Sequence, residues 1–159
     1  MIKKLLFIFC LGLVSCSHTP EQFRVTGPVF GTTYSIIYDS SQNFDTAFDS
    51  LFFEVNRSMS TYIPTSDISK VNVNETVVID HHFEAVFKTS KEIYTMTQGK
   101  FDPTIGAVVN AWDFGPEGKI EALDSLKINE LMQSVGMEKV TLSNGVISKP
   151  KASRLDFNA

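Results

Sequence analysis

The sequence predicts an α+β fold in which mixed β-sheets are flanked by helices, and three local patterns support that prediction. Residues 23–26 and 33–38 are rich in β-branched and aromatic side chains and are separated by a glycine-containing connection, which predicts a β-hairpin. Apolar residues recur at spacings of three and four over residues 44–59, the pattern of an amphipathic helix. Asn144-Gly145 separates two short apolar segments and matches the two positive-φ positions of a tight hairpin turn.

The middle of the chain predicts a loop, a short strand and a second helix. Residues 60–67 interrupt the helical pattern with hydroxyl, β-branched and proline residues, so we expect an exposed loop of the kind that often carries function. A brief strand is expected at residues 76–79. Asp80 is expected to cap the next helix through its carboxylate, and Gly99 to end that helix.

The last third of the chain predicts two more helices and a final strand. Asp102 is expected at the N-cap of a helix that begins at Pro103, because the first helical position tolerates a residue without an N–H. Residues 123–135 form another amphipathic segment, which Gly136 stops. Residues 155–157 predict one more strand.

The first residues have the pattern of a lipoprotein export signal. Lys3 and Lys4 precede an apolar run over residues 5–14, which is too short to span a bilayer and matches the charged and apolar regions of a secretory signal. The run ends beside Cys16 in a segment that resembles a lipobox, whose cysteine receives a lipid. The expected organisation is a signal peptide at residues 1–15, a lipidated tether at 16–22 and a folded domain at 23–159. We therefore expect a protein that is lipid-anchored to a bacterial membrane and faces the periplasm or the cell exterior; the alternative is an ordinary cleaved signal that contains a cysteine.

Composition and cysteine usage exclude several classes of site. A formal net charge of −4 and the lack of clustered lysine and arginine argue against nucleic-acid binding. The two cysteines are Cys10 in the signal and Cys16 at the expected lipid site, so the mature domain has no thiol pair for a disulfide or a thiolate metal site. His81 and His82 are adjacent and do not face the same side of a helix, which favours a solvated helix start over a metal site.

Four ordered blocks of sequence carry a family resemblance. They are Phe30-Gly31-Thr32-Thr33-Tyr34; Ser58-Met59-Ser60-Thr61-Tyr62 with Ser66-Asp67-Ile68-Ser69 and Asn72; Gly99-Lys100-Phe101-Asp102-Pro103-Thr104-Ile105-Gly106 with Trp112-x-Phe114-Gly115; and Leu155-Asp156-Phe157-Asn158-Ala159. In this combination the sequence resembles the ApbE family of flavin transferases (FAD:protein FMN transferases) over nearly the whole mature chain. The family fold continues well past Ala159, so the resemblance implies an N-terminal portion that is incomplete at its C-terminus.

The resemblance implies an enzyme that uses Mg²⁺ to cleave the pyrophosphate of FAD. FMN then passes through a phosphoester bond to a threonine or serine of a target protein, and AMP leaves. In phosphoryl transfer a divalent cation offsets phosphate charge, so the protein mainly supplies placement and electrostatics. The implied partners are FAD, acceptor proteins of membrane redox complexes such as sodium-translocating or Rnf-type pumps, and the membrane through the lipid.

Carried over block by block, the resemblance implies a set of site residues. The FAD contacts are Phe30, Tyr62, Lys100, Phe101, Asp102 and Asp156. Phe30 stands where the family often has methionine, a change that an apolar contact tolerates. Ala159 stands at a Mg²⁺-binding position, where only its backbone carbonyl could serve as a ligand. Each residue also has a purely structural alternative. Asp102 could cap a helix, Asp156 could lie in a turn at a strand end, and Tyr62 could cover the end of the first helix. Phe101 and Trp112 could be core aromatics, and for Trp112 core packing is the preferred role.

Two other functions stay open at this point. If water replaced the acceptor hydroxyl, the same metal site would make an FAD pyrophosphatase that releases FMN and AMP. A non-catalytic flavin-binding or structural lipoprotein would follow if the chain ended at Ala159, because about half of the implied active site would be missing. We expect FAD in a cleft between the present residues and the C-terminal part, and no catalytic residue can be assigned from the present residues.

Overall fold

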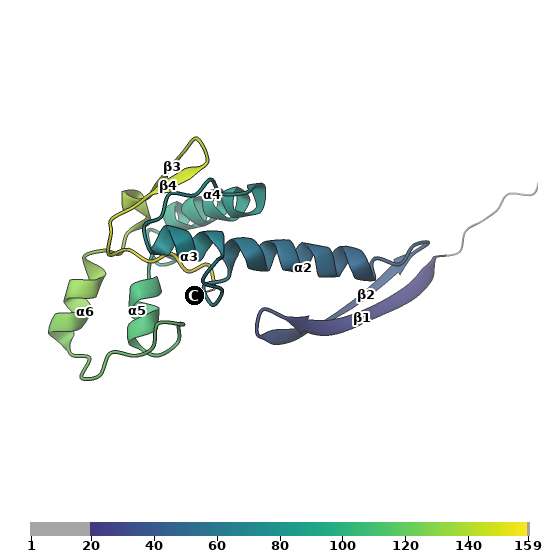
Figure 1. Cartoon of the computed structure of the whole chain (residues 1–159), viewed down its shortest axis with the longest axis horizontal. Coiled ribbons are helices and arrows are strands. Elements are labelled where there is room, and N and C mark those ends of the chain that lie inside the picture. The colour runs from purple at the N-terminus through teal and green to yellow at the C-terminus, as the bar shows by residue number, and fades with distance from the viewer. Residues whose placement is uncertain (1–19, 159) are drawn as a thin grey trace, which may run out of the picture. The chain divides into compact units, whose positions relative to one another are not determined.

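The computed structural model describes residues 20–158, which divide into two compact units on either side of the Phe48–Asp49 bond (Figure 1). The first unit contains strands β1 (Glu21–Val29) and β2 (Thr32–Ser40), which pair antiparallel in one register throughout. The turn residues Phe30 and Gly31 have φ values of 49° and 80°, as in the type I′ turn that suits a two-residue hairpin. The predicted hairpin is confirmed, with strands longer than the sequence pattern indicated.

Aromatic rings hold the start of the first helix against this hairpin. Phe23 stacks on Tyr38 across the two strands, with ring centroids 5.4 Å apart. Tyr38 also contacts Phe44 and Phe48, each at a centroid distance of 5.7 Å, and its hydroxyl accepts a hydrogen bond from the backbone N–H of Phe44 at 2.7 Å. The first turn of helix α2 (Asp45–Met59) is therefore fixed to the hairpin by side chains of its own unit.

The second unit is mainly helical. Its further elements are α3 (Asp67–Asn72), α4 (His81–Met96), α5 (Gly106–Ala111), α6 (Ser125–Met132), a 3₁₀ turn (Met137–Lys139), β3 (Thr141–Ser143) and β4 (Val146–Ser148). Asp80 caps α4 as predicted, because its carboxylate accepts a hydrogen bond from the N–H of Phe83 at 2.9 Å. Helix α3 was missed, since its six residues are too few for a helical period to stand out.

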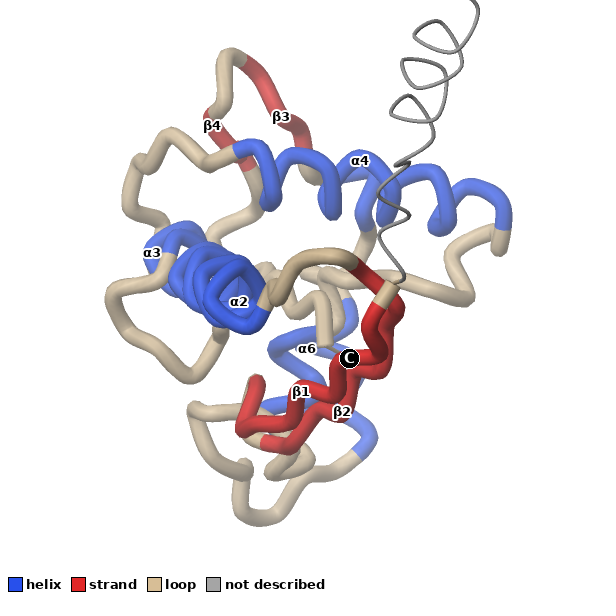
Figure 2. Tube along the Cα trace, turned by 90° about the vertical axis from the view of Figure 1, so that its right-hand side faces the viewer, coloured by secondary structure: helices blue, strands red, loops and turns tan. Residues whose placement is uncertain are grey.

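The core of the second unit is built from α3, α4 and the segment that follows α6. Its buried apolar residues are Ile68, Val71, Ile79, Phe83, Phe87, Met137, Val140 and Leu155. Phe83 is fully buried, and its ring meets the edge of Phe157 at 5.3 Å between centroids. The β3–β4 hairpin lies beside α4 (Figure 2) and packs Leu142 and Ile147 against this core.

The second predicted hairpin is also confirmed. Its turn residues Asn144 and Gly145 have φ values of 51° and 75°. The strand predicted at residues 76–79 is reduced to one antiparallel bridge between Val78 and Val146, together with a hydrogen bond from the N–H of Ile79 to the carbonyl of Gly145 at 2.9 Å. The loop that contains Val78 and Ile79 thus pairs with the outer edge of β4.

Three expectations for the last third of the chain are wrong. Helix α5 begins at Gly106, so Asp102 is not a helix cap; its Oδ1 instead accepts hydrogen bonds from the N–H and hydroxyl of Thr104, at 2.9 and 2.6 Å. Residues 155–157 do not form a strand, because pairing stops after a single parallel bridge between Ile105 and Arg154. Trp112 is 57% exposed and does not pack in the core.

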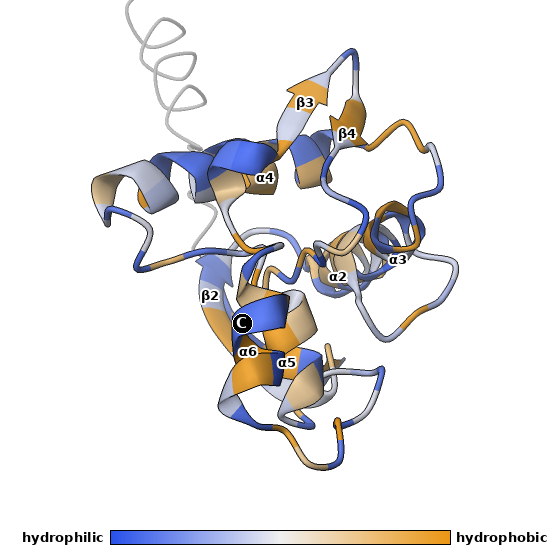
Figure 3. Cartoon of the chain, turned by 90° about the vertical axis from the view of Figure 1, so that its left-hand side faces the viewer, coloured by the Kyte–Doolittle hydropathy of each residue, from blue (hydrophilic) through white to orange (hydrophobic). Residues whose placement is uncertain are grey.

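Helices α5 and α6 lie side by side, and Figure 3 shows apolar residues on both. Leu126 and Met132 of α6 are among the exposed apolar side chains. Within residues 20–158 no helix has the length and apolar character needed to cross a membrane. The two-stranded sheets and the helices that pack on them agree with the predicted α+β class.

Candidate functional site

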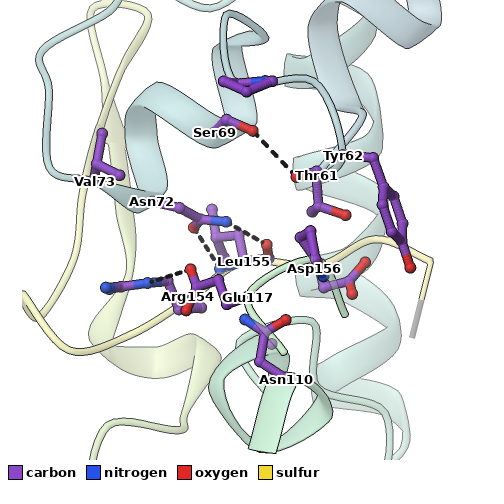
Figure 4. Close-up of a pocket in the computed structure, with 13 residues that line it drawn as sticks. Thr61, Tyr62, Ser69, Asn72, Val73, Asn110, Glu117, Arg154, Leu155 and Asp156 are labelled. Atoms are coloured by element: carbon purple, nitrogen blue, oxygen red, sulfur yellow. Dashed lines mark hydrogen bonds and ion pairs between the residues drawn. The ribbon is translucent and has the colours of Figure 1, made fainter. Parts of the chain in front are cut away.

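A pocket of about 340 Å³ opens in the second unit (Figure 4). Its lining comes from the loop after α2, from α3, from α5 and from the segment near Asp156; the lining residues are Thr61, Tyr62, Pro64, Ser69, Asn72, Val73, Gly106, Asn110, Pro116, Glu117, Arg154, Leu155 and Asp156. This volume is near the lower end of the range of about 300–1,000 Å³ that is usual for small-molecule sites.

The segment that carries Asp156 is held on both sides. On one side, the N–H of Asp156 donates to the carbonyl of Pro103 at 2.8 Å, and the N–H of Gly106 donates to the carbonyl of Arg154 at 3.1 Å. On the other side, the amide of Asn72 donates to the carbonyl of Leu155 at 2.8 Å and accepts from its N–H at 2.7 Å. The side chain of Asn72 therefore makes the two backbone hydrogen bonds to Leu155 that a neighbouring strand would otherwise make. Together these contacts fix the backbone at Asp156.

Close packing explains the glycine at the start of α5. A side-chain Cβ at Gly106 would lie 2.8 Å from the carbonyl oxygen of Arg154, which is closer than such contacts allow. The missing side chain lets α5 approach the Asp156 segment and brings the C-terminal block of sequence against the block that begins at Gly99.

The loop after α2 presents an aromatic ring to the pocket. Ser66 ties this loop together, because its hydroxyl donates to the carbonyl of Ser60 at 2.7 Å and accepts from the N–H of Ser69 at the start of α3. Tyr62 is 64% exposed, and its hydroxyl donates to the carbonyl of Phe114 at 3.2 Å. The ring is thus fixed by a hydrogen bond at its tip and remains accessible.

The charges at the pocket are two carboxylates and one guanidinium. Asp156 is buried, and its Oδ1 accepts hydrogen bonds from the N–H and the side-chain amide of Asn158, at 2.8 and 3.3 Å. Arg154 Nε pairs with Glu117 at 3.4 Å. With one carboxylate already paired, Asp156 gives the pocket a net negative character.

Lys149 contacts the segment that leads to Asp156 and the end of α3. Its ammonium donates to the carbonyl of Ser153 at 2.8 Å, to the side chain of Asn74 at 3.0 Å and, at the longer distance of 3.5 Å, to the carbonyl of Asn72. Burial, together with the nearby positive charge of Arg154, lowers the pKa of Lys149 to about 8. All its acceptors are neutral, so nothing offsets the loss of hydration by opposite charge.

The ApbE family profile matches this sequence over residues 30–159. The chain belongs to the ApbE family. It is 32% identical over 149 residues to an FAD:protein FMN transferase of Vibrio cholerae, with coverage of 87% of this chain and 45% of that protein, and 30% identical to the FAD:protein FMN transferase of Haemophilus influenzae, with coverage of 90% and 44%. This ApbE-family chain thus spans about half the length of the relatives it matches.

The fold agrees with solved structures of the same family. The flavin transferase ApbE from Vibrio cholerae superposes with a TM-score of 0.77 at 31% identity, covering 87% of this chain and 48% of that one. The apo form of the Pseudomonas stutzeri flavinyl transferase ApbE gives a TM-score of 0.79 at 21% identity, covering 91% and 49%, and shows the shared fold.

The structure brings part of the predicted FAD set together. Tyr62 and Asp156 line the pocket. Lys100, Phe101 and Asp102 do not line it, although they directly precede Pro103, whose carbonyl pairs with Asp156. Phe30 lies in the β1–β2 turn, within the first unit. Ala159 and Cys16 lie outside residues 20–158, and so do the predicted signal and most of the tether.

Sequence reasoning missed Asn110, Glu117 and Arg154 as pocket residues. The signal for Asn110 was a single amide within the apolar stretch that leads to Trp112, which is an unusual place for a polar side chain on a short helix. No sequence pattern around Glu117 or Arg154 indicates a site, because the two residues are 37 positions apart and come into contact only in the folded chain.

The family resemblance implies a bound Mg²⁺, which prefers oxygen ligands such as carboxylates. Residues 20–158 contain no group of three or more histidine, cysteine, aspartate or glutamate side chains placed to hold a metal ion. Within the described residues, no such cluster of side chains is therefore available to Mg²⁺.

Proposed function

We propose that the whole protein transfers FMN from FAD to a threonine or serine of a target protein, with Mg²⁺ as the required metal, and releases AMP. The observation that supports this most directly is that Tyr62 and Asp156, from two separate blocks of the family pattern, line one pocket. Relatives at 30–32% identity are named FAD:protein FMN transferase. The acceptors we propose are redox proteins of membrane complexes.

The proposed reaction moves one phosphoryl group. The acceptor hydroxyl oxygen forms a bond to the phosphorus on the FMN side of the pyrophosphate, the bond from that phosphorus to the bridging oxygen breaks, and the oxygen leaves with AMP. The hydroxyl proton passes to the departing phosphate or to solvent. A bound divalent cation supplies charge compensation for the phosphates.

In this proposal the described residues bind and orient FAD. The exposed ring of Tyr62 offers a stacking surface, and the buried carboxylate of Asp156 offers a hydrogen-bond acceptor at a rigid position. Lys100, Phe101 and Asp102 contribute further FAD contacts, and Phe30 an apolar one. Ala159 contributes its carbonyl to the metal.

The test uses the protein expressed from its complete gene, with FAD, Mg²⁺ and an acceptor domain of a redox complex. We expect flavin fluorescence to become covalently attached to the acceptor and AMP to appear in equal amount. Free FMN without labelled acceptor would identify an FAD pyrophosphatase instead. FAD binding with neither product would identify a flavin-binding protein and overturn the transferase proposal.

Asp102→Asn separates an FAD contact from a structural role. The asparagine Oδ1 can still accept from Thr104, so the melting temperature is expected to change little. Loss of a charge-assisted hydrogen bond to FAD is expected to raise the FAD concentration needed for half-maximal rate about tenfold or more. Asp124→Asn is the matched control, because Asp124 caps α6 and asparagine caps about as well. An unchanged FAD dependence in Asp102→Asn would remove Asp102 from the proposed FAD site.

We also propose that Cys16 carries a lipid, including palmitate, and tethers the protein to a membrane on its extracytoplasmic face. The support is the charged and apolar signal pattern that ends at this cysteine. Cells grown with a palmitate analogue should label the parent protein, and Cys16→Ala should abolish the label. Equal labelling of both proteins would refute the lipid site.

A further inference from the structure

The two carboxylate oxygens of Asp102 are in different states. Its Oδ1 accepts hydrogen bonds from the N–H and the hydroxyl of Thr104, at 2.9 and 2.6 Å. Its Oδ2 makes no hydrogen bond or ion pair with any of residues 20–158. Asp102 is half-buried, so its carboxylate has lost part of its hydration. One oxygen is therefore occupied within the described fold, and the other is left to a donor from outside it.

Thr104 holds this carboxylate through a directed pair of hydrogen bonds. Thr104 is fully buried, and its Oγ1 accepts a hydrogen bond from the N–H of Gly136 at 2.7 Å. The N–H of Gly136 can only donate, so the single hydroxyl proton of Thr104 is directed to Asp102. A hydroxyl that donates to an ionised carboxylate makes one of the stronger hydrogen bonds in proteins. Thr104 therefore connects Asp102 to the backbone at Gly136.

The backbone at Gly136 is a fixed anchor. Gly136 has a φ value of 138° and directly precedes Met137, which is fully buried in the core. A side-chain Cβ at Gly136 would lie 2.3 Å from the carboxylate of Glu138, so only glycine is accommodated there. The carboxylate of Glu138 also accepts a hydrogen bond from the hydroxyl of Tyr94 on α4, at 2.5 Å. The anchor of Thr104 is thus tied to the core and to α4.

The residues that lead to Asp102 are held from their other side by the end of α4. The N–H of Gly99 donates to the carbonyl of Tyr94 at 2.9 Å. The N–H of Phe101 donates to the hydroxyl oxygen of Thr97 at 3.2 Å. The backbone before Asp102 and its carboxylate are therefore both fixed before any ligand binds, which reduces the entropy that binding costs.

We propose that Thr104 is a positioning residue for FAD binding. Anchored by Gly136, it orients the carboxylate of Asp102 so that Oδ2 accepts a hydrogen bond from FAD. An ionised carboxylate accepts hydrogen bonds and repels phosphate, so the FAD group concerned is a hydroxyl or an N–H. The inference rests on the FAD contact proposed for Asp102. Thr104 acts only through Asp102 and takes no part in bond making or breaking.

The first experiment measures the dissociation constant of FAD, without Mg²⁺ or acceptor, for the protein expressed from its complete gene and for two Thr104 variants. Thr104→Val keeps the shape but removes the hydroxyl, and is expected to weaken FAD binding about fivefold to tenfold. Thr104→Ser restores the hydroxyl and is expected to bind FAD within about twofold of the parent. Parent-like binding in Thr104→Val, or an equal loss in both variants, would overturn the inference.

A core substitution controls for general destabilisation. Ile79→Val shortens a buried side chain in the core and leaves the hydrogen bonds of Thr104 in place. Its melting temperature is expected to fall, while its dissociation constant for FAD should equal that of the parent. A loss of FAD binding in Ile79→Val that matched the loss in Thr104→Val would mean that the effect follows stability and would refute positioning.

A double-mutant cycle tests whether Thr104 acts through Asp102. In the Asp102→Asn background, Thr104→Val is expected to weaken FAD binding by less than about twofold further, because the oriented oxygen is already lost. The cycle cancels any effect of Thr104→Val that is independent of Asp102. Losses that multiply in full would show that Thr104 acts by another route and would reject the inference.

Binding and transfer separate this inference from the proposed function. If Thr104 and Asp102 are coupled in FAD binding but the parent transfers no FMN, the proposed function alone is rejected. If the parent transfers FMN and Thr104→Val shows the same FAD dependence of the rate, this inference alone is rejected.

Discussion

Asn72 and Asn110 line the same pocket from two short helices and are almost equally buried, at 8% and 9% exposure, yet their amides are in opposite states. The amide of Asn72 uses its donor and its acceptor on the backbone of Leu155. The amide of Asn110 has no partner among residues 20–158. Two asparagines of nearly equal exposure can therefore differ in whether their amides are hydrogen-bonded within the described fold.

The same contrast holds for two threonines. Thr104 is fully buried, donates to Asp102 at 2.6 Å and accepts from the N–H of Gly136 at 2.7 Å. The hydroxyl of Thr61 is equally inaccessible and has no partner in the described structure. Paired groups such as Asn72 and Thr104 are therefore expected to contribute more to stability than Asn110 and Thr61 do.

The largest expected effect is on stability and comes from Asn72. Asn72→Ala leaves the buried N–H and carbonyl of Leu155 without partners, at about 1–3 kcal/mol for each group, so we expect the free energy of unfolding to fall by about 2–6 kcal/mol. Asn110→Ala is the matched variant and should change it by about 1 kcal/mol or less. Urea unfolding monitored by circular dichroism measures both values. Equal losses in the two variants would contradict the distinction between them.

An intermediate effect is expected for the threonine pair. Thr104→Val leaves the N–H of Gly136 unpaired and should lower the free energy of unfolding by about 1–3 kcal/mol. The same substitution at Thr61 removes a hydroxyl that had no partner and should leave stability unchanged or slightly higher. Differential scanning calorimetry of the two variants compares them directly. A larger loss for Thr61→Val than for Thr104→Val would reverse the assignment.

The smallest expected effect depends on pH and concerns Lys149, which supports the backbone of Asn72. Its pKa is about 8 in the folded protein against 10.5 for an ordinary lysine, so between these values the unfolded chain binds more protons than the folded one. The contribution of Lys149 to stability should therefore rise with pH across this window. Partial exposure makes the effect modest.

The measurement compares melting temperatures of the parent and Lys149→Met between roughly pH 7.5 and pH 10.5, the range in which Lys149 loses its proton in the folded and then in the unfolded protein. Groups common to both proteins cancel in the difference. The parent should gain relative to the variant as pH rises. If the melting-temperature difference between the parent and the variant stayed constant, or if the parent lost stability relative to the variant toward high pH, the pKa of Lys149 would not be lowered in the folded protein.

Local signals predicted much of the secondary structure. The Phe30-Gly31 and Asn144-Gly145 turns and the Asp80 cap depend on backbone conformation and on partners a few residues away, so the sequence specifies them. The start of α5 was placed at the wrong residue. Asp102 and Pro103 have the local preferences of a helix start, but backbone pairing of residues 103–106 with residues 154–156 prevents helical geometry there.

The pocket residues, too, could be predicted from the sequence only in part. The four ordered blocks of sequence predicted the family, and with it Tyr62 and Asp156, which the fold then places in one pocket. The states of Asn72 and Asn110 could not be predicted, because an asparagine has the same chemistry in both places and its partner lies far away in sequence. Leu155 is 83 residues from Asn72. Turns, caps and family pattern were therefore determined by the sequence itself, whereas the tertiary structure decided which buried polar groups are paired, since that depends on contacts between distant segments.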